Sequence, residues 1–369
     1  MAGIQVAANW TVAVILALIA WLLGESVLPG AAPHQPAAVY WVLACAAAVL
    51  FLASLLGHEL SHALVARRNG LAVRAITLWM LGGITELEGE PPDAAADLKI
   101  AVAGPAVSAA AGGVFLGAAV AVKYAGGPAV VTAALVWLAL MNGMLAVFNM
   151  LPGAPLDGGR VLRAVLWRRY RDRHRAEIAA ARAGQFLGAG ITGIGAAELL
   201  LWDVPGGLWL MLIGWFLISA ADAEKRAAMA TSALAGLRVA DVMTADPQVA
   251  HGWITVQDFI DRVAAWPRQD AFPVVDWDGG LVGVVVIGQL ARIPPGDRAR
   301  RRLDRVALAV PPPYLAAPED PAGPLLAHRP LGGEVMAIVL AGGQVVGIVT
   351  AGDLRQAVRR HKLDTAPAV

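Results

Sequence analysis

Cysteine is nearly absent from this chain of 369 residues, since Cys45 is the only one. A single cysteine excludes a framework of internal disulfides. Because Cys45 lies in a long apolar run, we expect it to be a small buried residue without a chemical role. Charged residues are also scarce, at 15%, while 58% of the chain is hydrophobic and the mean hydropathy is +0.61. This composition excludes an ordinary soluble protein and indicates that much of the chain lies in lipid.

The chain also lacks a continuous basic stripe. Its formal net charge is +1, and its basic residues lie in short patches between apolar runs, so we expect no nucleic-acid partner. The start of the first apolar run has neither a positively charged segment nor a small-residue cleavage site. We therefore expect that run to be retained as a membrane anchor.

Long apolar runs occupy the first two-thirds of the chain. A helix needs about 20 apolar residues to cross a hydrocarbon core of about 30 Å. From about Leu237 the sequence becomes proline-rich and charged, with the short Val/Ile runs typical of a soluble α/β domain. The sequence predicts a polytopic α-helical membrane domain over 1–225, with about six transmembrane helices, followed by a small α/β module. The expected spans lie near 8–24, 38–66, 98–122, 129–151, 184–202 and 205–222.

The distribution of Lys and Arg predicts the orientation. Arg67, Arg68 and Arg74 follow the second run, and seven arginines follow the fourth run between positions 160 and 175. The alternating links 25–37, 123–128 and 203–204 together hold a single lysine. Because Lys and Arg concentrate on the cytosolic side, we expect both termini and the C-terminal module to be cytosolic in a cell membrane.

A metal-binding pattern ends the second run, where residues 58–62 read HELSH. Residues four apart share one face of a helix, so His58 and His62 can bind one ion while Glu59 lies beside it to activate water. Such side chains are costly in a membrane helix, and they persist where they face a polar interior and perform a task. Catalytic zinc takes three protein ligands and leaves one position for water, so a third ligand has to lie elsewhere.

Asp157 is the best candidate for the third ligand. It lies in the segment 149–160, NMLPGAPLDGGR, whose prolines and glycines prevent a regular helix. Broken backbone at membrane depth is tolerated where protein or a water-filled cavity surrounds it, and such a break can turn a carboxylate inward. The alternative is that the helix simply ends here and leaves Asp157 solvated in a turn. Under the predicted topology, His58, His62 and Asp157 come to a similar depth.

These paired motifs resemble the site-2 protease family of intramembrane zinc metalloproteases: an HExxH in one span and N-x-x-P-x-x-P-L-D-G about a hundred residues later. The resemblance covers roughly 1–225. It implies that one Zn²⁺ is bound by His58, His62 and Asp157 and that Glu59 is the general base, which takes a proton from the attacking water.

The same resemblance implies a substrate. The family hydrolyses a peptide bond in or near the transmembrane segment of a single-pass protein, such as a membrane-tethered transcription regulator, in regulated intramembrane proteolysis. Asn149 matches a family position thought to hold the substrate or the site. Residues 81–84, LGGI, resemble a glycine-containing hairpin that is taken to pair with an unwound substrate, where Gly82 and Gly83 would allow close backbone approach. An ordinary loop turn is the alternative. Residues 104–108, GPAVS, also fit a family pattern, although we expect them to serve helix packing alone.

The final third contains two similar stretches, 282–290 and 346–354, each a short apolar strand followed by the start of a helix. They resemble tandem CBS domains covering roughly 237–361, with repeats at about 237–292 and 303–361. A CBS pair implies a possible homodimer through this module.

The CBS resemblance also implies a nucleotide site. Thr350 and Asp353 match family positions that hold the ribose of an adenine nucleotide, whereas the first repeat has Val286 and Gln289 there. One nucleotide site at most is therefore well equipped. The alternative is a dimerisation or substrate-gating module without a ligand.

Three classes of function fit these features. The first is a protease modulated by its CBS pair, and the second is a non-catalytic membrane sensor that keeps a structural metal and reports nucleotide. The third, a CBS-regulated transporter or channel, leaves His58, His62 and Asp157 unexplained. A structural metal site needs no base beside it, so Glu59 favours the protease.

Overall fold

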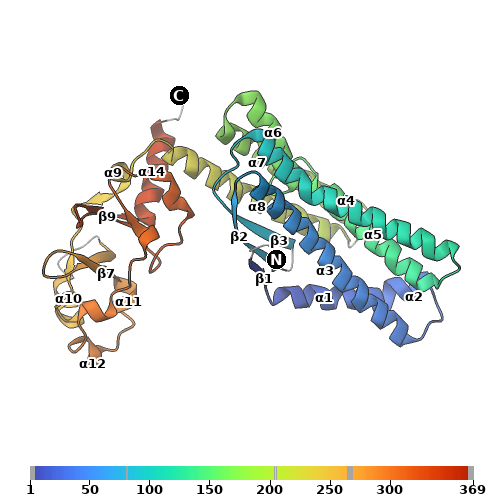
Figure 1. The fold of residues 1–369 in the computed structure, drawn as a ribbon, viewed down its shortest axis with the longest axis horizontal. Helices are drawn as coiled ribbons and strands as arrows, with labels where there is room; N and C mark the ends of the chain where they lie inside the picture. Colours follow the sequence, from blue (N-terminus) through green and yellow to red (C-terminus); the bar gives the residue numbers. More distant parts are fainter. Residues whose placement is uncertain (1–4, 80–81, 203, 205, 264–268, 365–369) are drawn as a thin grey trace. The chain divides into compact units, whose positions relative to one another are not determined.

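The computed structural model describes residues 5–79, 82–202, 204, 206–263 and 269–364. The chain forms two compact units, Met1–Arg226 and Ala227–Val369, which we call the N-terminal unit and the C-terminal unit (Figure 1). Each is described by itself below.

Helices make up most of the N-terminal unit. Six of the helical segments described are long and apolar enough to cross a membrane, which confirms the predicted number. The elements are α1 (Thr11–Leu22), η1 (Leu23–Val27), α2 (Leu28–Ala31), α3 (Ala37–Arg68), α4 (Ala94–Tyr124), α5 (Ala129–Asn149), α6 (Asp157–Tyr170), α7 (Arg173–Trp202) and α8 (Gly206–Leu234). The first three together form one span, and each of the others except α6 is a span.

Most of the helices are longer than the apolar runs that predicted them, although α5 ends at Asn149, where we expected 151. The fifth span begins at Arg173, where we expected 184, and the sixth continues to Leu234, where we expected 222. Both extra portions carry charged and polar side chains. Composition marks the part of a helix that lies in lipid, whereas hydrogen bonding continues the helix beyond it.

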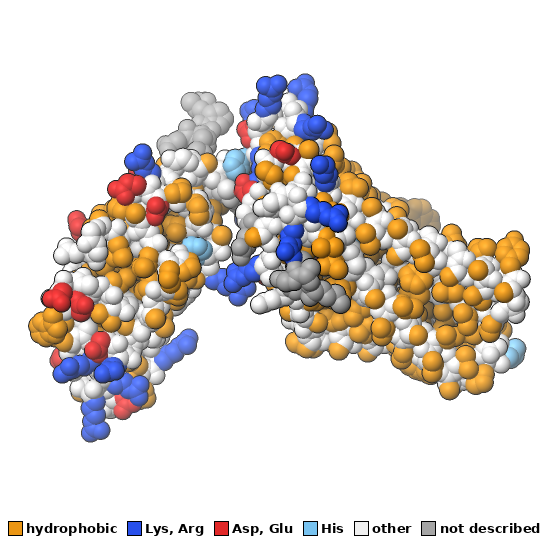
Figure 2. All heavy atoms as spheres, viewed as in Figure 1, with side chains coloured by type: hydrophobic (Ala, Val, Ile, Leu, Met, Phe, Trp, Pro, Cys, Tyr) orange, Lys and Arg blue, Asp and Glu red, His pale blue; other side chains and the backbone are white. Residues whose placement is uncertain are grey.

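The outer surface of these helices is apolar, and this corrects the expectation for Cys45. Its side chain is exposed on α3 and free. Figure 2 shows hydrophobic side chains spread over the helical body of the N-terminal unit, with Lys and Arg gathered at the end that carries α6. An apolar run in a span predicts contact with lipid as readily as burial in protein, so the run around Cys45 did not establish burial.

Helices α3, α4 and α5 pack together in the N-terminal unit (Figure 1). Small residues such as Ala44 and Ala47 on α3 are almost fully buried, and they pack in one cluster with Leu138 of α5. Small side chains permit the close helix contacts that membrane proteins need in the absence of a hydrophobic driving force between helices.

Two strands in the link between α3 and α4 form a three-stranded sheet with a strand that precedes α1. Its order is β1 (Gln5–Ala8), β2 (Ala72–Trp79) and β3 (Gly82–Glu88), with β1 parallel and β3 antiparallel to β2. Among the strands described, β3 pairs with β2 alone, so it forms an edge. Gly82 opens β3 with a φ of +146°, a region that favours glycine. The predicted hairpin is therefore present, although its Leu81 lies outside the described residues.

The C-terminal unit is a small α/β module, as predicted. One sheet has the order β4-β10-β9-β8 and the other β5-β6-β7. The two matched stretches correspond to β7 followed by α11 and to β10 followed by α14. The elements are α9 (Val239–Val242), β4 (Thr244–Ala245), β5 (Ala250–His251), α10 (Val256–Val263), β6 (Ala271–Val275), β7 (Leu281–Val286), α11 (Ile287–Leu290), α12 (Pro295–Arg298), α13 (Leu303–Val306), η2 (Pro312–Tyr314), β8 (Leu315–Ala316), η3 (Gly323–Ala327), β9 (Val335–Ala341), β10 (Gln344–Thr350) and α14 (Ala351–Asp364).

Candidate metal centre

Three side chains from two helices meet inside the N-terminal unit. The Nε2 atoms of His58 and His62 on α3 lie 3.2 Å apart, and each lies 3.2 Å from Oδ2 of Asp157 on α6. The two histidines are buried and Asp157 is half-buried. The structure therefore brings together the three ligands that the sequence predicted.

The triangle has the dimensions of a zinc site. A tetrahedral ion with ligand bonds of about 2.0 Å holds its ligand atoms about 3.3 Å apart. Nδ1 of His62 lies 2.6 Å from the carbonyl oxygen of Ile100, which can only accept, so this nitrogen carries the ring hydrogen. In the neutral ring, Nε2 then presents a lone pair to the carboxylate. The lone pair of His62 and the carboxylate repel each other unless a cation or a proton lies between them, and two imidazoles with one carboxylate fit zinc.

Local structure explains how Asp157 reaches the histidines. Residues 150–156 are not helical, and α6 begins at Asp157 itself. A carboxylate in the first turn of a helix is stabilised by the positive end of the helix dipole. The broken segment was predicted, and the alternative of a solvated turn is wrong.

Glycines allow the broken segment to fold tightly. A Cβ on Gly158 would overlap the backbone of Met150 and Leu151, and one on Gly159 would overlap the backbone at Gly153. On α7, a Cβ on Gly184 would overlap the carbonyl oxygen of Ala154. These close backbone contacts fix the place where α6 starts, and therefore the position of Asp157.

Helix α4 packs against the rings of His58 and His62. This corrects our expectation that residues 104–108 serve helix packing alone. A Cβ on Gly104 would overlap the ring nitrogens of His58 and His62. The hydroxyl of buried Ser108 lies 2.9 Å from Nδ1 of His58. Such outer partners fix the tautomer and the orientation of a ligand imidazole. Gly104 and Ser108 therefore act on the metal ligands and do not serve packing alone.

Glu59 is buried beside the ligands, on the side facing the sheet. The hydroxyl of Thr85 on β3 donates a hydrogen bond of 2.9 Å to its Oε2. A Cβ on Gly83 would lie 2.6 Å from Cδ and 2.9 Å from Oε1 of Glu59, closer than such atoms can approach. Gly83 thus lies against the predicted base, whereas a Cβ on Gly82 would meet nothing within 4 Å.

An ion-pair network anchors α6. Fully buried Asp97 on α4 accepts hydrogen bonds from Nε and Nη2 of Arg163 at 2.8 and 2.7 Å. Arg160 lies 3.6 Å from the same carboxylate, and Arg163 lies 3.5 Å from Glu177 of α7. Burial would lower the pKa of Arg163, but its hydrogen bonds to Asp97 raise it. Sequence reasoning used these arginines only for orientation and missed Asp97, which has no motif around it.

Asn149 is the last residue of α5 and is half-buried. No hydrogen bond found among the described side chains joins it to His58, His62 or Asp157. Its assignment to substrate holding stays a prediction.

In the C-terminal unit, Thr350 and Asp353 lie together at the start of α14. Oδ2 of Asp353 accepts from the backbone nitrogen and the hydroxyl of Thr350 at 2.8 and 2.7 Å, which is a helix cap. Oδ1 accepts from the hydroxyl of Thr244 at 3.2 Å. Thr244 and Asp353 line a hollow of about 390 Å³ together with Arg360. In the first repeat, the amide of Gln289 donates to the carbonyl oxygen of Val306 at 2.8 Å, so it serves the fold.

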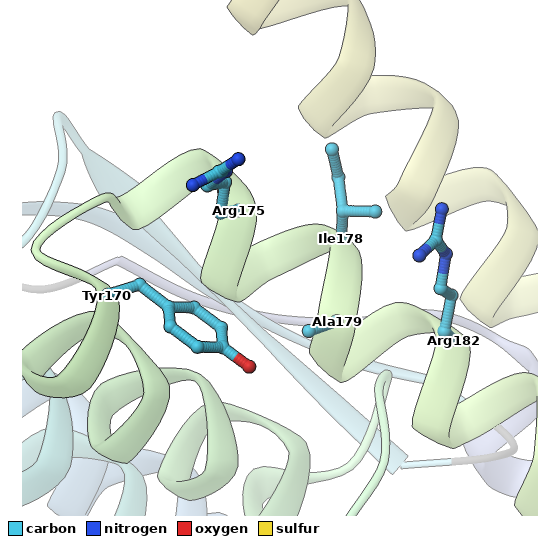
Figure 3. Close-up of a pocket in the computed structure, with 5 residues that line it drawn as sticks. All are labelled: Tyr170, Arg175, Ile178, Ala179 and Arg182. Carbon is cyan, nitrogen blue, oxygen red and sulfur yellow. The ribbon is translucent and has the colours of Figure 1, made fainter.

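Another hollow, of about 380 Å³, opens between the end of α6 and α7. It is lined by Tyr170, Arg175, Ile178, Ala179 and Arg182 (Figure 3). Figure 3 shows Arg175, Ile178 and Arg182 projecting from one side of α7. No metal ligand lines it, so this hollow is not the catalytic cavity. It belongs to the arginine-rich end of the N-terminal unit.

The chain is similar in sequence to known proteins. The model of peptidase family M50 matches residues 46–126 and 126–191. The zinc metalloprotease Rip3 from Mycobacterium tuberculosis is 44% identical over 340 residues, which are 92% of this chain and 86% of Rip3. The solved site-2 protease from Methanocaldococcus jannaschii is 28% identical and covers 61% of this chain and 93% of its own, with a TM-score of 0.41. The solved CBS domain of a bacterial CNNM/CorC-family Mg²⁺ transporter is 21% identical, with a TM-score of 0.31, and covers 37% of this chain and 97% of its own.

Proposed function

Because the chain belongs to peptidase family M50, the site-2 protease family of intramembrane zinc metalloproteases, we propose that it cuts a single-pass membrane protein in or near its transmembrane segment. We propose further that this step is part of regulated intramembrane proteolysis, with a membrane-tethered transcription regulator as the substrate.

The observation that carries the proposal is the triangle of His58, His62 and Asp157, whose atoms are spaced for one tetrahedral ion with a position left open. When bound there, zinc supplies Lewis-acid polarisation of a carbonyl oxygen and makes water more acidic. Glu59 follows His58 on α3 and is the general base: its carboxylate takes a proton from the attacking water and passes it to the leaving amine.

The edge of β3 is the proposed place where the substrate binds. A transmembrane helix protects its peptide bonds with its own hydrogen bonds, so it has to unwind before it can be cut. A strand with an unpaired edge offers backbone partners to an unwound segment. Gly82 and Gly83 open that strand without side chains, and Gly83 lies against Glu59. A substrate on this edge would therefore lie near the base.

The arginine-rich links support the proposal that both termini and the C-terminal unit are cytosolic. We propose that the CBS pair modulates the protease, with an adenine nucleotide beside Thr350 and Asp353 and with homodimers forming through this module. The hollow lined by Thr244, Asp353 and Arg360 supports a phosphorylated ligand, because Arg360 supplies a positive charge and Thr244 a hydroxyl.

The test is cleavage of a panel of single-pass substrates by purified protein in lipid vesicles, with metal measured by elemental analysis. The wild type should hold about one zinc per chain and cut at least one substrate. Glu59→Gln should keep the zinc and lose cleavage, because glutamine cannot accept the proton. Glu25→Gln changes an exposed carboxylate on η1, outside the strand proposed for the substrate, and this control should behave as wild type.

Two outcomes would reverse the proposal. Full cleavage by Glu59→Gln would show that Glu59 is not the general base. A wild-type protein without stoichiometric metal would return the non-catalytic sensor to consideration, although the similarity to a zinc metalloprotease over 92% of the chain favours the enzyme. A transporter reading does not account for the three converging ligands.

A further inference from the structure

We infer that Thr85 is a positioning residue for Glu59, so that the strand offered to the substrate also sets the orientation of the general base. This inference rests on the proposed role of Glu59. It concerns a contact across 26 residues of sequence, between β3 and α3, for which the sequence carries no motif.

The contact is a charge-assisted hydrogen bond. Oγ1 of Thr85 lies 2.9 Å from Oε2 of Glu59 and 3.4 Å from its backbone oxygen. An ionised carboxylate can only accept, so the hydroxyl of Thr85 is the donor, and its single hydrogen is directed to the shorter and charged contact. Glu59 is buried, with 8% of its surface exposed, so a protein donor takes the place that water would have at the surface.

Gly83 completes the arrangement. Side chains alternate along a strand, so positions 83 and 85 face the same side. At 85 that side carries the hydroxyl that holds Oε2, and at 83 it carries only hydrogen, which leaves room for Oε1 and Cδ. One carboxylate oxygen is thus fixed by Thr85 while the other has space over Gly83. A general base needs one free oxygen directed at the water, and this pair of residues provides it.

The arrangement also couples substrate docking to the base. A glutamate side chain has three rotatable bonds, and without a partner its carboxylate samples several orientations. The same short stretch of β3 carries the contacts to Glu59 and the edge proposed for substrate pairing. A substrate that pairs with β3 would hold the strand in place, and through Thr85 it would hold the carboxylate.

The test compares two substitutions at one position. Thr85→Val keeps the shape of the side chain and removes the hydroxyl, whereas Thr85→Ser keeps the hydroxyl. For Thr85→Val we expect kcat to fall about tenfold or more, a part of the roughly 10²–10⁴-fold that general-base catalysis supplies, with KM and zinc content unchanged. Thr85→Ser should recover most of the lost kcat. Gly83→Ala should lower kcat as well, because its Cβ displaces Glu59.

Thr77→Val is the matched control, since Thr77 lies on neighbouring β2 and is half-buried. It should leave kcat, KM and zinc content as in the wild type. Photocrosslinking of an uncut substrate to each variant gives a readout that does not depend on turnover, and Thr85→Val should crosslink as the wild type does. A purely structural role would instead lower zinc content or crosslinking together with kcat.

Glu59→Gln in the same assay distinguishes a failure of the inference about Thr85 from a failure of the proposed role of Glu59. If Glu59→Gln is inactive while Thr85→Val retains the wild-type kcat, or while Thr85→Ser is as impaired as Thr85→Val, the inference about Thr85 is wrong and the protease assignment stands. If Glu59→Gln is fully active, the proposed base itself is wrong.

Discussion

Asp157 in the N-terminal unit and Asp353 in the C-terminal unit each lie in the first turn of a helix. The side chains that contact their carboxylates differ in kind. Asp157 begins α6, and its Oδ2 lies 3.2 Å from the Nε2 atoms of both His58 and His62 on another helix. Asp353 lies in the first turn of α14, and its Oδ2 accepts hydrogen bonds from its own neighbour Thr350. The carboxylate of Asp157 faces two imidazole nitrogens from another helix, whereas the carboxylate of Asp353 accepts hydrogen bonds from Thr350 and from Thr244 of β4.

The difference shows how to separate a metal ligand from a capping residue. Donors at the start of α14 satisfy Asp353, so helix stability is sufficient to explain that residue. The ligand atoms of His58, His62 and Asp157 are spaced to hold one cation, so helix stability alone does not explain Asp157. The two aspartates have the same helical position, and the chemistry of their neighbours separates them.

The largest effect we expect comes from removing the two carboxylates in turn. Asp157→Ala should lose stoichiometric zinc and all cleavage, because two imidazoles remain as ligands. Asp353→Ala should keep stoichiometric zinc and full cleavage. It should destabilise the C-terminal unit by about 1 kcal/mol, because α14 loses a capping interaction. Elemental analysis, cleavage in vesicles and thermal unfolding measure the three quantities. Retention of zinc by Asp157→Ala would contradict the assignment of Asp157 as a metal ligand.

Asp97 sharpens the comparison, because it is a third aspartate near the start of a helix and its buried partner is a permanent cation. Asp97→Asn should destabilise the N-terminal unit by about 3 kcal/mol, since the buried charge of Arg163 then keeps only its 3.5 Å contact with Glu177. Asp172→Asn weakens an exposed pair with Arg175 and should cost about 1 kcal/mol or less. Denaturant unfolding in detergent provides the measurement, and equal effects would contradict the assigned role of the network.

Gly104 tests whether α4 acts on the ligands. Gly104→Ala should weaken zinc binding by about 10–100-fold, the range found when outer partners of metal ligands are changed. Gly113→Ala, on the same helix, is the control, because its Cβ would meet nothing within 4 Å. Zinc retained during titration with a chelator measures the effect. If the two variants hold zinc equally, Gly104 serves packing alone.

The smallest effect concerns the C-terminal unit. Thr350→Val should remove most of the proposed adenine-nucleotide binding and leave cleavage without nucleotide unchanged. Thr255→Val is the matched control for Thr350→Val. The hydroxyl of Thr255 donates a hydrogen bond of 2.7 Å to Asp258 in the same capping arrangement at α10. Both changes should cost about 1 kcal/mol of stability. Calorimetric titration with AMP and ATP should show weaker nucleotide binding for Thr350→Val but not for Thr255→Val. Equal binding by the two variants would mean that Thr350 only caps α14.

Local patterns in the sequence were enough to predict the spans and the ligands. Apolar length predicted six membrane helices, the spacing of His58 and His62 predicted a shared face, and the broken segment identified Asp157. The C-terminal repeat was visible because two strand-helix stretches match. Each span, ligand motif and matching stretch is encoded within about 30 consecutive residues or fewer.

Contacts between distant segments could not be predicted in this way. The pairing of β1 with β2 joins Gln5 to Ala75, and the pairing of Asp97 with Arg163 crosses 66 residues. Neither pair has a spacing that marks it, because it depends on how whole helices and strands pack. Thr85 was missed for the same reason, and Ser108 was assigned to helix packing although its segment had been singled out.

The length of α3 has a consequence for what a cut achieves. Its uncharged apolar stretch, residues 38–57, is about 30 Å long as a helix and fills the hydrocarbon layer by itself. His58 follows directly, so the metal centre lies at the boundary of that layer, on the side of Arg67 and Arg68. A substrate severed at this depth would keep almost its whole span in one fragment. The other fragment would carry far fewer than the roughly 20 apolar residues that hold a chain in lipid, and it would diffuse away from the membrane. Hydrolysis of one bond at this position would therefore release a domain of the proposed single-pass substrate.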